Sequence, residues 1–225
     1  MRRGVAKFYT FLIYFFLYAP ILVLIAFSFN ESPSRGKWGG FSLKWYGELF
    51  QDRTIMSSLT NTLLIALISA VIATIIGTIA AIGIHKMRPI AKSIVMNATY
   101  LPVLNPDIVT GISLMLLFVF LSIPLGFTSL LMAHITFNIP YVILSVMPRM
   151  KQLNPSTYEA ALDLGASQTY AFFKVVFPDI LPGILSVFLM AFTMSLDDFI
   201  ITHFTKGPGV DTLSTKIYTE VKKGI

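Results

Sequence analysis

Three carboxylates stand within or beside long apolar stretches of this chain, which carries only 11 acidic side chains in 225 residues. Asp107 opens one apolar stretch, and the adjacent Asp197 and Asp198 lie near the end of another. A charged side chain near the centre of a bilayer costs about 2.5–3.5 kcal/mol on insertion scales, so such acids usually face a cavity, a partner or a pathway. With the ring of Phe199 beside them, these carboxylates form a candidate binding surface for a cation.

Structural roles are also open for the same acids. Asn105 is suited to cap a helix that starts at Pro106, which would put Asp107 in the first turn, where the helix dipole favours negative charge. Asp197 and Asp198 could instead bond to backbone groups or pair with a cation of another subunit. Because adjacent helical residues point about 100° apart, one could line a pathway while the other caps a helix or pairs.

The composition indicates a membrane protein. Hydrophobic residues make up 55% of the chain, charged residues 12%, and the mean hydropathy is +0.75, which favours burial of apolar surface in lipid. The absence of cysteine excludes disulfides and thiolate metal sites. Cysteine usage therefore does not indicate whether the protein works in an oxidising or a reducing compartment. The basic residues behind the net charge of +6 are scattered through loops, so we expect no nucleic-acid partner.

Five apolar segments are long enough to cross a bilayer as helices, because a hydrocarbon core about 30 Å thick needs roughly 20 helical residues. Within a single transmembrane domain over 1–225, they cover residues 8–29, 59–84, 94–121, 127–147 and 180–204. The third segment is too long to be straight and contains Pro102 and Pro106, so we expect a broken helix. A polar loop, residues 148–179, separates the last two segments.

Two patterns within these segments predict helix packing. Ala73, Gly77 and Ala81 recur at four-residue intervals, a small-residue stripe that lets another helix approach closely. His134 and Asn138 lie one turn apart in the fourth segment, where interhelical hydrogen bonding is the expected role. The three histidines of the chain are widely separated and show no metal-ligand spacing, so we expect no metal site.

The distribution of basic residues favours a cytoplasmic N-terminus. Basic residues crowd the first segment and the turn after the second: Arg2, Arg3, Lys7, Lys86, Arg88 and Lys92. This orientation puts the polar loop in the cytoplasm. It leaves an opposing group of lysines outside: Lys206, Lys216, Lys222 and Lys223.

The polar loop carries its own helix signals. Asn154 is a good N-cap before a proline, and Gly165 can take the left-handed conformation that ends a helix. Ser167 could then cap a second short helix over residues 168–176 that ends before Pro178. The sequence therefore predicts a helix, a glycine turn and a second helix outside the bilayer.

The first of these helices would present a narrow acidic surface. Ala160 and Ala161 keep one side slim, while Glu159 and Asp163 lie four residues apart and share a face. Such a helix could enter a cleft of another subunit and pair with its basic residues. An amphipathic connector resting on lipid headgroups explains the same pattern, and the residues alone leave both interpretations open.

The spacing in this loop resembles the cytoplasmic signature of binding-protein-dependent ABC transporter permeases, written E-A-A, three residues, G, nine residues, I-x-L-P. Here it reads Glu159-Ala160-Ala161, then Gly165, then Val175-Val176-Phe177-Pro178, with apolar replacements of the Ile and the Leu. Three further segments extend the resemblance: residues 105–109, 134–140 and 195–199. With them, nearly the whole chain resembles the second permease subunit of spermidine/putrescine ABC importers.

The resemblance implies an all-α transmembrane bundle of the type I ABC importer kind in a bacterial inner membrane, with a sixth span expected beyond Ile225. The implied partners are a second permease subunit, two cytoplasmic ATPase subunits, an extracytoplasmic polyamine-binding protein and membrane lipid. The chain has no G-x-x-x-x-G-K-[ST] phosphate loop. It is therefore not expected to be an enzyme or to hold a cofactor, and ATP and Mg²⁺ are expected on the partner ATPase.

The role of the coupling residues follows from the same resemblance. Coupling to the ATPase is implied for Glu159, Ala160, Ala161, Asp163, Gly165 and Pro178. The substrate pathway is predicted from the acids in or beside the apolar spans, not from the resemblance, and its residues are Asp107, Asp197, Asp198 and Phe199. A linear polyamine has ammonium groups joined by methylenes, which suits carboxylates set apart with apolar or aromatic surface between them.

Other functions stay open at this point. A permease for another solute would carry the same coupling signature, although acids in the spans argue against an anion. A membrane enzyme has no support, because the chain contains no H-E-x-x-H, nucleophile elbow or convincing intramembrane catalytic pair. A scaffold or passive channel would use the loop helix to bind something other than an ATPase.

Overall fold

The computed structural model describes residues 2–33 and 36–223, and every named element in that part of the chain is a helix. The chain falls into two compact units, residues 1–56 with 221–225 and residues 57–220. The expected all-α membrane fold is confirmed by these helices and their apolar composition. The single transmembrane domain over 1–225 stays a prediction.

The first unit contains α1 (Arg2–Ser28) and α2 (Lys44–Gln51). The most apolar window of α1 has none of its residues buried, so its own unit covers no face of this helix. In the turn that follows, the Asn30 amide donates to the carbonyl of Lys37 at 2.8 Å and accepts from the N–H of Gly39 at 2.7 Å. These bonds fix a compact turn between the two helices.

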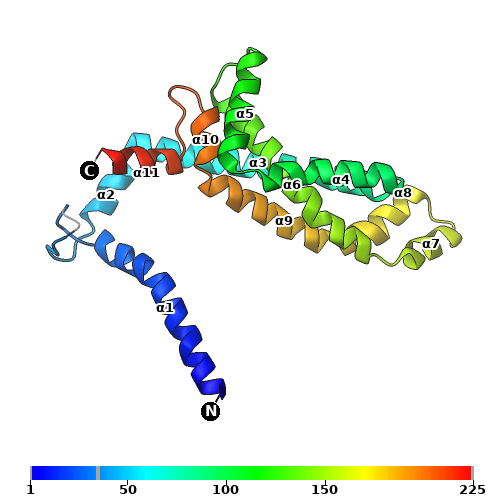
Figure 1. The fold of residues 1–225 in the computed structure, drawn as a ribbon, viewed down its shortest axis with the longest axis horizontal. Coiled ribbons are helices and arrows are strands. Elements are labelled where there is room, and N and C mark those ends of the chain that lie inside the picture. Colours follow the sequence, from blue (N-terminus) through cyan, green and yellow to red (C-terminus); the bar gives the residue numbers. More distant parts are fainter. Residues whose placement is uncertain (1, 34–35, 224–225) are drawn as a thin grey trace. The chain divides into compact units, whose positions relative to one another are not determined.

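The body of the second unit consists of α3 (Arg53–His85), α6 (Phe127–Gln152) and α9 (Phe177–Asp197), with α6 and α9 side by side (Figure 1). Small residues of α3 let α6 approach, since a Cβ placed on Gly77 would lie 2.6 Å from the Cβ of Val142. Ala73 and Ala81 on the same stripe are fully buried. The predicted stripe is therefore confirmed as a packing surface.

By length and composition, four helices within the described residues can cross a membrane: Gly4–Ser28, Arg53–His85, Phe127–Gln152 and Gln168–Asp197. A fifth crossing is obtained if α4 (Pro89–Leu104) and α5 (Asp107–Phe120) count as one span, although they meet at 105°. The described residues therefore offer four or five crossings, and the five predicted spans stay a prediction. The sharp bend confirms that the third segment is broken.

The predicted start of α5 is wrong by one residue. Asn105 ends α4 with a ψ of 143°, as expected for a residue that a following proline drives out of the helical region. Pro106 is also extended, with a ψ of 139°, and no side chain caps the helix there. Asp107 is nevertheless in the first turn of α5, as predicted.

The fifth apolar segment, predicted as one span over residues 180–204, contains a break. The helix α9 ends at Asp197, Asp198 is extended at φ −60° and ψ 127°, and the short α10 (Ile200–Thr205) follows. Because α10 packs on α5 and α6, the chain turns away from α9 at this point (Figure 1). Hydropathy did not reveal the break, since the apolar residues continue on both sides of it. The last helix is α11 (Leu213–Lys222).

Helix extends into the polar loop from both sides, because α6 runs past Pro148 to Gln152 and helix resumes after α7 at Gln168, as predicted. From there α8 (Gln168–Ala171), a π-helical turn η1 (Phe172–Val176) and α9 form one continuous helical stretch, so the predicted end before Pro178 is wrong. The N–H of Phe177 bonds to the carbonyl of Phe172, five residues back. This wide turn accommodates a proline, which has no N–H, in the first turn of α9.

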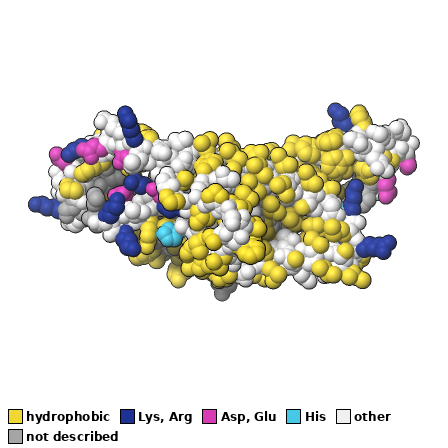
Figure 2. Space-filling view, turned by 90° about the horizontal axis from the view of Figure 1, so that it is seen from above, with side chains coloured by type: hydrophobic (Ala, Val, Ile, Leu, Met, Phe, Trp, Pro, Cys, Tyr) yellow, Lys and Arg dark blue, Asp and Glu magenta, His cyan; other side chains and the backbone are white. Residues whose placement is uncertain are grey.

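The surface of the second unit is apolar between its ends. Figure 2 shows hydrophobic side chains over its middle, and charged side chains at the end formed by α7 (Pro155–Asp163) and α8. The exposed apolar side chains include Leu67, Ile75 and Ile79 of α3. Such a surface suits lipid hydrocarbon, while the charged end suits headgroups and water.

Candidate functional site

The N-terminus of α7 has the predicted cap. Asn154 is extended, and its side-chain oxygen accepts a hydrogen bond from the N–H of Ser156 at 3.1 Å. Pro155 stands at the first helical position, where its missing N–H has no cost. The sequence therefore fixes where this nine-residue helix begins, independently of tertiary packing.

The C-terminus of α7 is a glycine turn, also as predicted. Gly165 has a φ of +86°, and its N–H bonds to the carbonyl of Leu162 at 2.9 Å. The N–H of Ala166 bonds to the carbonyl of Ala161 at 3.1 Å, which completes a Schellman motif. A Cβ on Gly165 would meet nothing within 4 Å, so glycine is required by the backbone conformation and not by space.

Between these two ends, α7 presents an acidic surface. Glu159, Ala160 and Asp163 are exposed, and the side chain of Leu164, just after the helix, is 89% exposed. Pro178 is also exposed, but it belongs to the first turn of α9. The predicted coupling residues therefore divide between two elements, and five of the six lie on α7 and its glycine turn.

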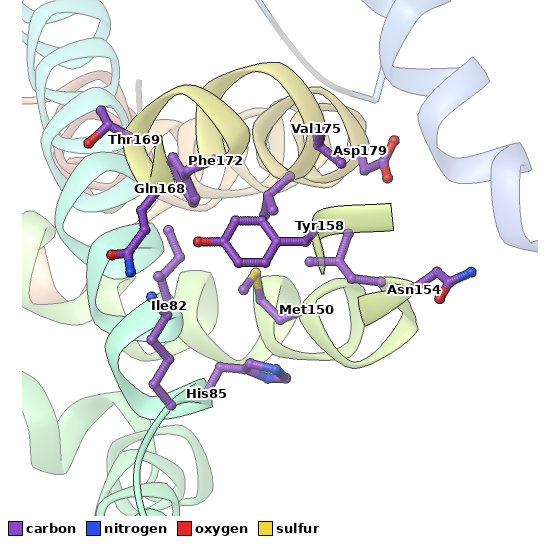
Figure 3. Close-up of a pocket in the computed structure, with 13 residues that line it drawn as sticks. Ile82, His85, Met150, Asn154, Tyr158, Gln168, Thr169, Phe172, Val175 and Asp179 are labelled. Atoms are coloured by element: carbon purple, nitrogen blue, oxygen red, sulfur yellow. The ribbon is translucent and has the colours of Figure 1, made fainter. Parts of the chain in front are cut away.

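A cavity of about 400 Å³ lies beneath α7 (Figure 3). Tyr158 of α7 reaches into it, and side chains from α3, α6 and η1, such as Ile82, Met150 and Phe172, form the opposite walls. The cavity separates part of α7 from the bundle, and Tyr158 lies in this space.

The acidic pair is divided by the break between α9 and α10. Asp197 is the last residue of α9 and is exposed, whereas the side chain of Asp198 is 9% exposed. The Asp198 carboxylate accepts the N–H of Thr202 at 2.8 Å, the N–H of Ile201 at 3.3 Å and the hydroxyl of Thr202 at 2.9 Å. The carboxylate of Asp197 is thus exposed, while that of Asp198 is bonded to backbone. This is one of the arrangements that the sequence left open.

Phe199 lies within the break, and Asp107 lies on the helix that packs against α10. The ring of Phe199 lies 4.7 Å from the ring of Tyr218 in α11 and 5.4 Å from that of His203, measured between centroids. Gly111, one turn after Asp107 on α5, packs against Ile200 at the start of α10. Asp107 is exposed one turn before this contact.

Helix α6 supplies the polar contacts predicted for its histidine and asparagine. His134 Nε2 lies 3.0 Å from the hydroxyl of Thr202 in α10, and the Asn138 amide donates to Ser195 of α9 at 2.7 Å. Ser195 also bonds to Ser69 of α3 at 3.1 Å. Thr202 and Ser195 were not recognised from the sequence, although the four-residue spacing of Asp198 and Thr202 is compatible with a capped helix.

No metal centre is visible in this arrangement. Within the residues that the structure describes, no group of three or more His, Cys, Asp and Glu side chains is placed to hold an ion. The buried polar side chains of His134 and Asn138 instead bond across helices.

These features belong to a known class of membrane protein. Residues 73–221 match the family Binding-protein-dependent transport system inner membrane component. The chain belongs to this family and is a transport permease subunit of the inner membrane.

Among its curated relatives are polyamine permeases of Escherichia coli (strain K12). The chain is 39% identical over 213 residues to the spermidine/putrescine transport system permease protein PotC, covering 95% of this chain and 81% of PotC. It is 40% identical over 220 residues to the putrescine transport system permease protein PotI, covering 93% of this chain and 77% of PotI. The predicted resemblance is confirmed.

The fold also matches a solved structure. A crystal structure of a bacterial ABC transporter involved in the import of the acidic polysaccharide alginate superposes with a TM-score of 0.78 at 19% identity, covering 98% of this chain and 84% of that chain. This likeness confirms the predicted architecture of an ABC importer permease.

Proposed function

We propose that this chain forms half of the translocation pathway of an ATP-driven polyamine importer, and that α7 couples that pathway to a cytoplasmic ATPase. The observation that carries the proposal is α7 itself, a helix with both ends fixed by its own residues and an exposed acidic face. Because the cap and the glycine turn stabilise both ends of α7, the helix can transmit a displacement of the ATPase as a rigid body.

The predicted orientation is part of this proposal. With the N-terminus in the cytoplasm, α7 and the charged end around it face the compartment that contains ATP, and the break at Asp198 lies toward the opposite side. The chain itself catalyses no reaction in this scheme. ATP and Mg²⁺ bind to two ATPase subunits, a second permease subunit completes the pathway, and a soluble binding protein delivers the substrate from outside.

The choice of a polyamine rests on two observations. Both relatives described above are polyamine permeases by name, and they are aligned with more than nine-tenths of this chain. The region around the break carries an open carboxylate at Asp197, a second at Asp107 and the aromatic ring of Phe199. Carboxylates and an aromatic face are the groups that bind ammonium ions joined by methylenes.

The test is uptake by the assembled complex. The chain is co-expressed with its partner permease and ATPase, reconstituted into proteoliposomes with the binding protein, and supplied with labelled spermidine. We expect ATP-dependent uptake that unlabelled di-, tri- and tetra-amines reduce. A neutral diol of the same length is the matched control and should not compete.

Two results contradict the proposal in different ways. If the intact complex never contains an ATPase, α7 is not a coupling helix, and a scaffold or channel is favoured. If an ATPase is present but the neutral diol competes as well as the amines, the complex is an importer of another solute.

A further inference from the structure

The break between α9 and α10 exposes backbone groups in an otherwise apolar span, and the chain bonds several of them specifically. Two N–H groups at the start of α10 donate to the Asp198 carboxylate, as described above. On the other side, the carbonyl of Asp198 accepts the hydroxyl of Ser214 from α11 at 2.6 Å. Since unpaired backbone groups are costly in a membrane interior, these bonds stabilise the break at this residue.

The hydrogen bonds around Asp198 form a directed chain. The Thr202 hydroxyl has one proton and donates it to Asp198, so its oxygen is free to accept from His134 Nε2. This direction assigns the imidazole proton to Nε2. His134 is 1% exposed, which places a buried donor behind the threonine that holds the carboxylate.

Helix α6 forms hydrogen bonds with both α9 and α10, the two halves of the broken span. Asn138 bonds to Ser195 at 2.7 Å, three residues before Asp198, and His134 bonds to Thr202 at 3.0 Å, four residues after it. His134 and Asn138 are themselves one turn apart on α6. The two halves are therefore held to one rigid face, and the angle between them is set by α6.

Asp197 is in the opposite situation. It is exposed, and within the described residues it makes no side-chain hydrogen bond or ion pair. Its position depends on where α9 ends, and the bonds of Asp198 determine that end. The two neighbouring carboxylates thus have different surroundings, one fully engaged by the protein and one open.

We infer that His134 and Thr202 are positioning residues that hold Asp198 as the structural pin of the break, so that Asp197 is the carboxylate of the pair that meets the cationic substrate. The inference rests on the proposed polyamine pathway and divides the roles of the two acids within it. Asn138 supports the pin by holding the α9 half.

The test combines transport with a distance measurement. The chain has no cysteine, so thiols introduced at the exposed positions Leu189 and His203 can carry spin labels that report the angle between α9 and α10. Asp197→Asn should raise the KM for spermidine about tenfold, the scale of a hydrogen bond to a charged group, and leave the distance unchanged.

The matched variants of the pin should behave differently. Asp198→Asn keeps one acceptor oxygen, which can take the two bonds from Thr202 but not also the bond from the N–H of Ile201 at the other oxygen. The distance should therefore broaden less than in Asp198→Ala, and the KM should rise less than in Asp197→Asn. Asp198→Ala removes the acceptor and should broaden the distance distribution. Thr202→Val should broaden it as well, while Thr202→Ser, which restores the hydroxyl, should return it to the wild-type width.

Three results overturn the inference. The first is an Asp198→Asn variant whose KM rises as much as that of Asp197→Asn while the distance between the spin labels is unchanged. The charge of Asp198 would then interact with the substrate directly. The second is a distance distribution as narrow as that of wild type in both Asp198→Ala and Thr202→Val. The third is an unchanged KM in Asp197→Asn. The distance measurement needs no substrate, so it tests the pin even where polyamine uptake by the wild-type complex fails.

Discussion

Replacing Gly165 tests whether the glycine turn of α7 matters for coupling. At a φ of +86°, an alanine costs about 1–2 kcal/mol relative to glycine. A Cβ there meets nothing within 4 Å, so no clash inside the chain adds to this figure. A nine-residue helix has little stability of its own, and this cost shifts the population of the intact turn by about 5- to 30-fold.

The assay compares spermidine uptake per ATP hydrolysed in proteoliposomes containing wild type, Gly165→Ala and Gly165→Asn. We expect Gly165→Ala to assemble and hydrolyse ATP but to lose uptake per ATP by up to the same factor, with faster amide exchange in α7. Asparagine tolerates the left-handed conformation and is the control that should stay closer to wild type. Equal uncoupling by both variants would refute strain as the cause, and normal coupling in Gly165→Ala would refute the role of the turn.

Further predictions follow from single contacts. Gly77→Ala places a Cβ 2.6 Å from that of Val142 and should destabilise the complex by about 1–3 kcal/mol in thermal unfolding, whereas Gly83→Ala, with nothing within 4 Å, should be neutral or stabilising. Asn154→Ala removes the cap of α7 and should cost about 0.5–2 kcal/mol, seen as faster amide exchange in that helix, while Asn154→Ser should retain protection. Asp107→Asn should assemble normally and raise the KM for polyamine, because its carboxylate is exposed one turn before the contact of Gly111 with α10; an unchanged KM would remove it from the pathway.

The parts of the fold that the sequence predicted well are those decided by neighbouring residues. The cap at Asn154 and the left-handed Gly165 depend on local backbone and side-chain chemistry, and both are found where the sequence places them. The small-residue stripe and the polar pair on α6 were predicted for a related reason, since such residues in an apolar span have few roles other than packing and interhelical bonding.

The errors have two causes: contacts between distant residues at the break, and local backbone geometry beside two prolines. The break at Asp198 is stabilised by Thr202, His134 and Ser214, which lie on three different helices, so the apolar sequence around it reads as one span. Pro178 was expected to follow the end of a helix. The π turn before it lets the helix continue through a residue that has no backbone N–H to donate. Asn105 was predicted to be the N-cap of α5, but it ends α4. Two extended residues, Asn105 and Pro106, separate the two helices, so α5 begins one residue later than predicted.

Helix α6 joins the two regions on which the proposed mechanism depends. It contributes His134 and Asn138 to the break, and it ends at Gln152, two residues before the cap of α7. From Asn138 to that end, about 14 residues of helix cover roughly 21 Å, and an apolar core shared with α9 runs along this length. In the proposed mechanism, a displacement of α7 reaches the acid pair through this packed helix, and Pro140 and Pro148 are the positions where it can bend. The route through α9 passes the glycine turn and the π turn, so we expect α6 to carry the displacement and adjustment to occur on the other side of α7.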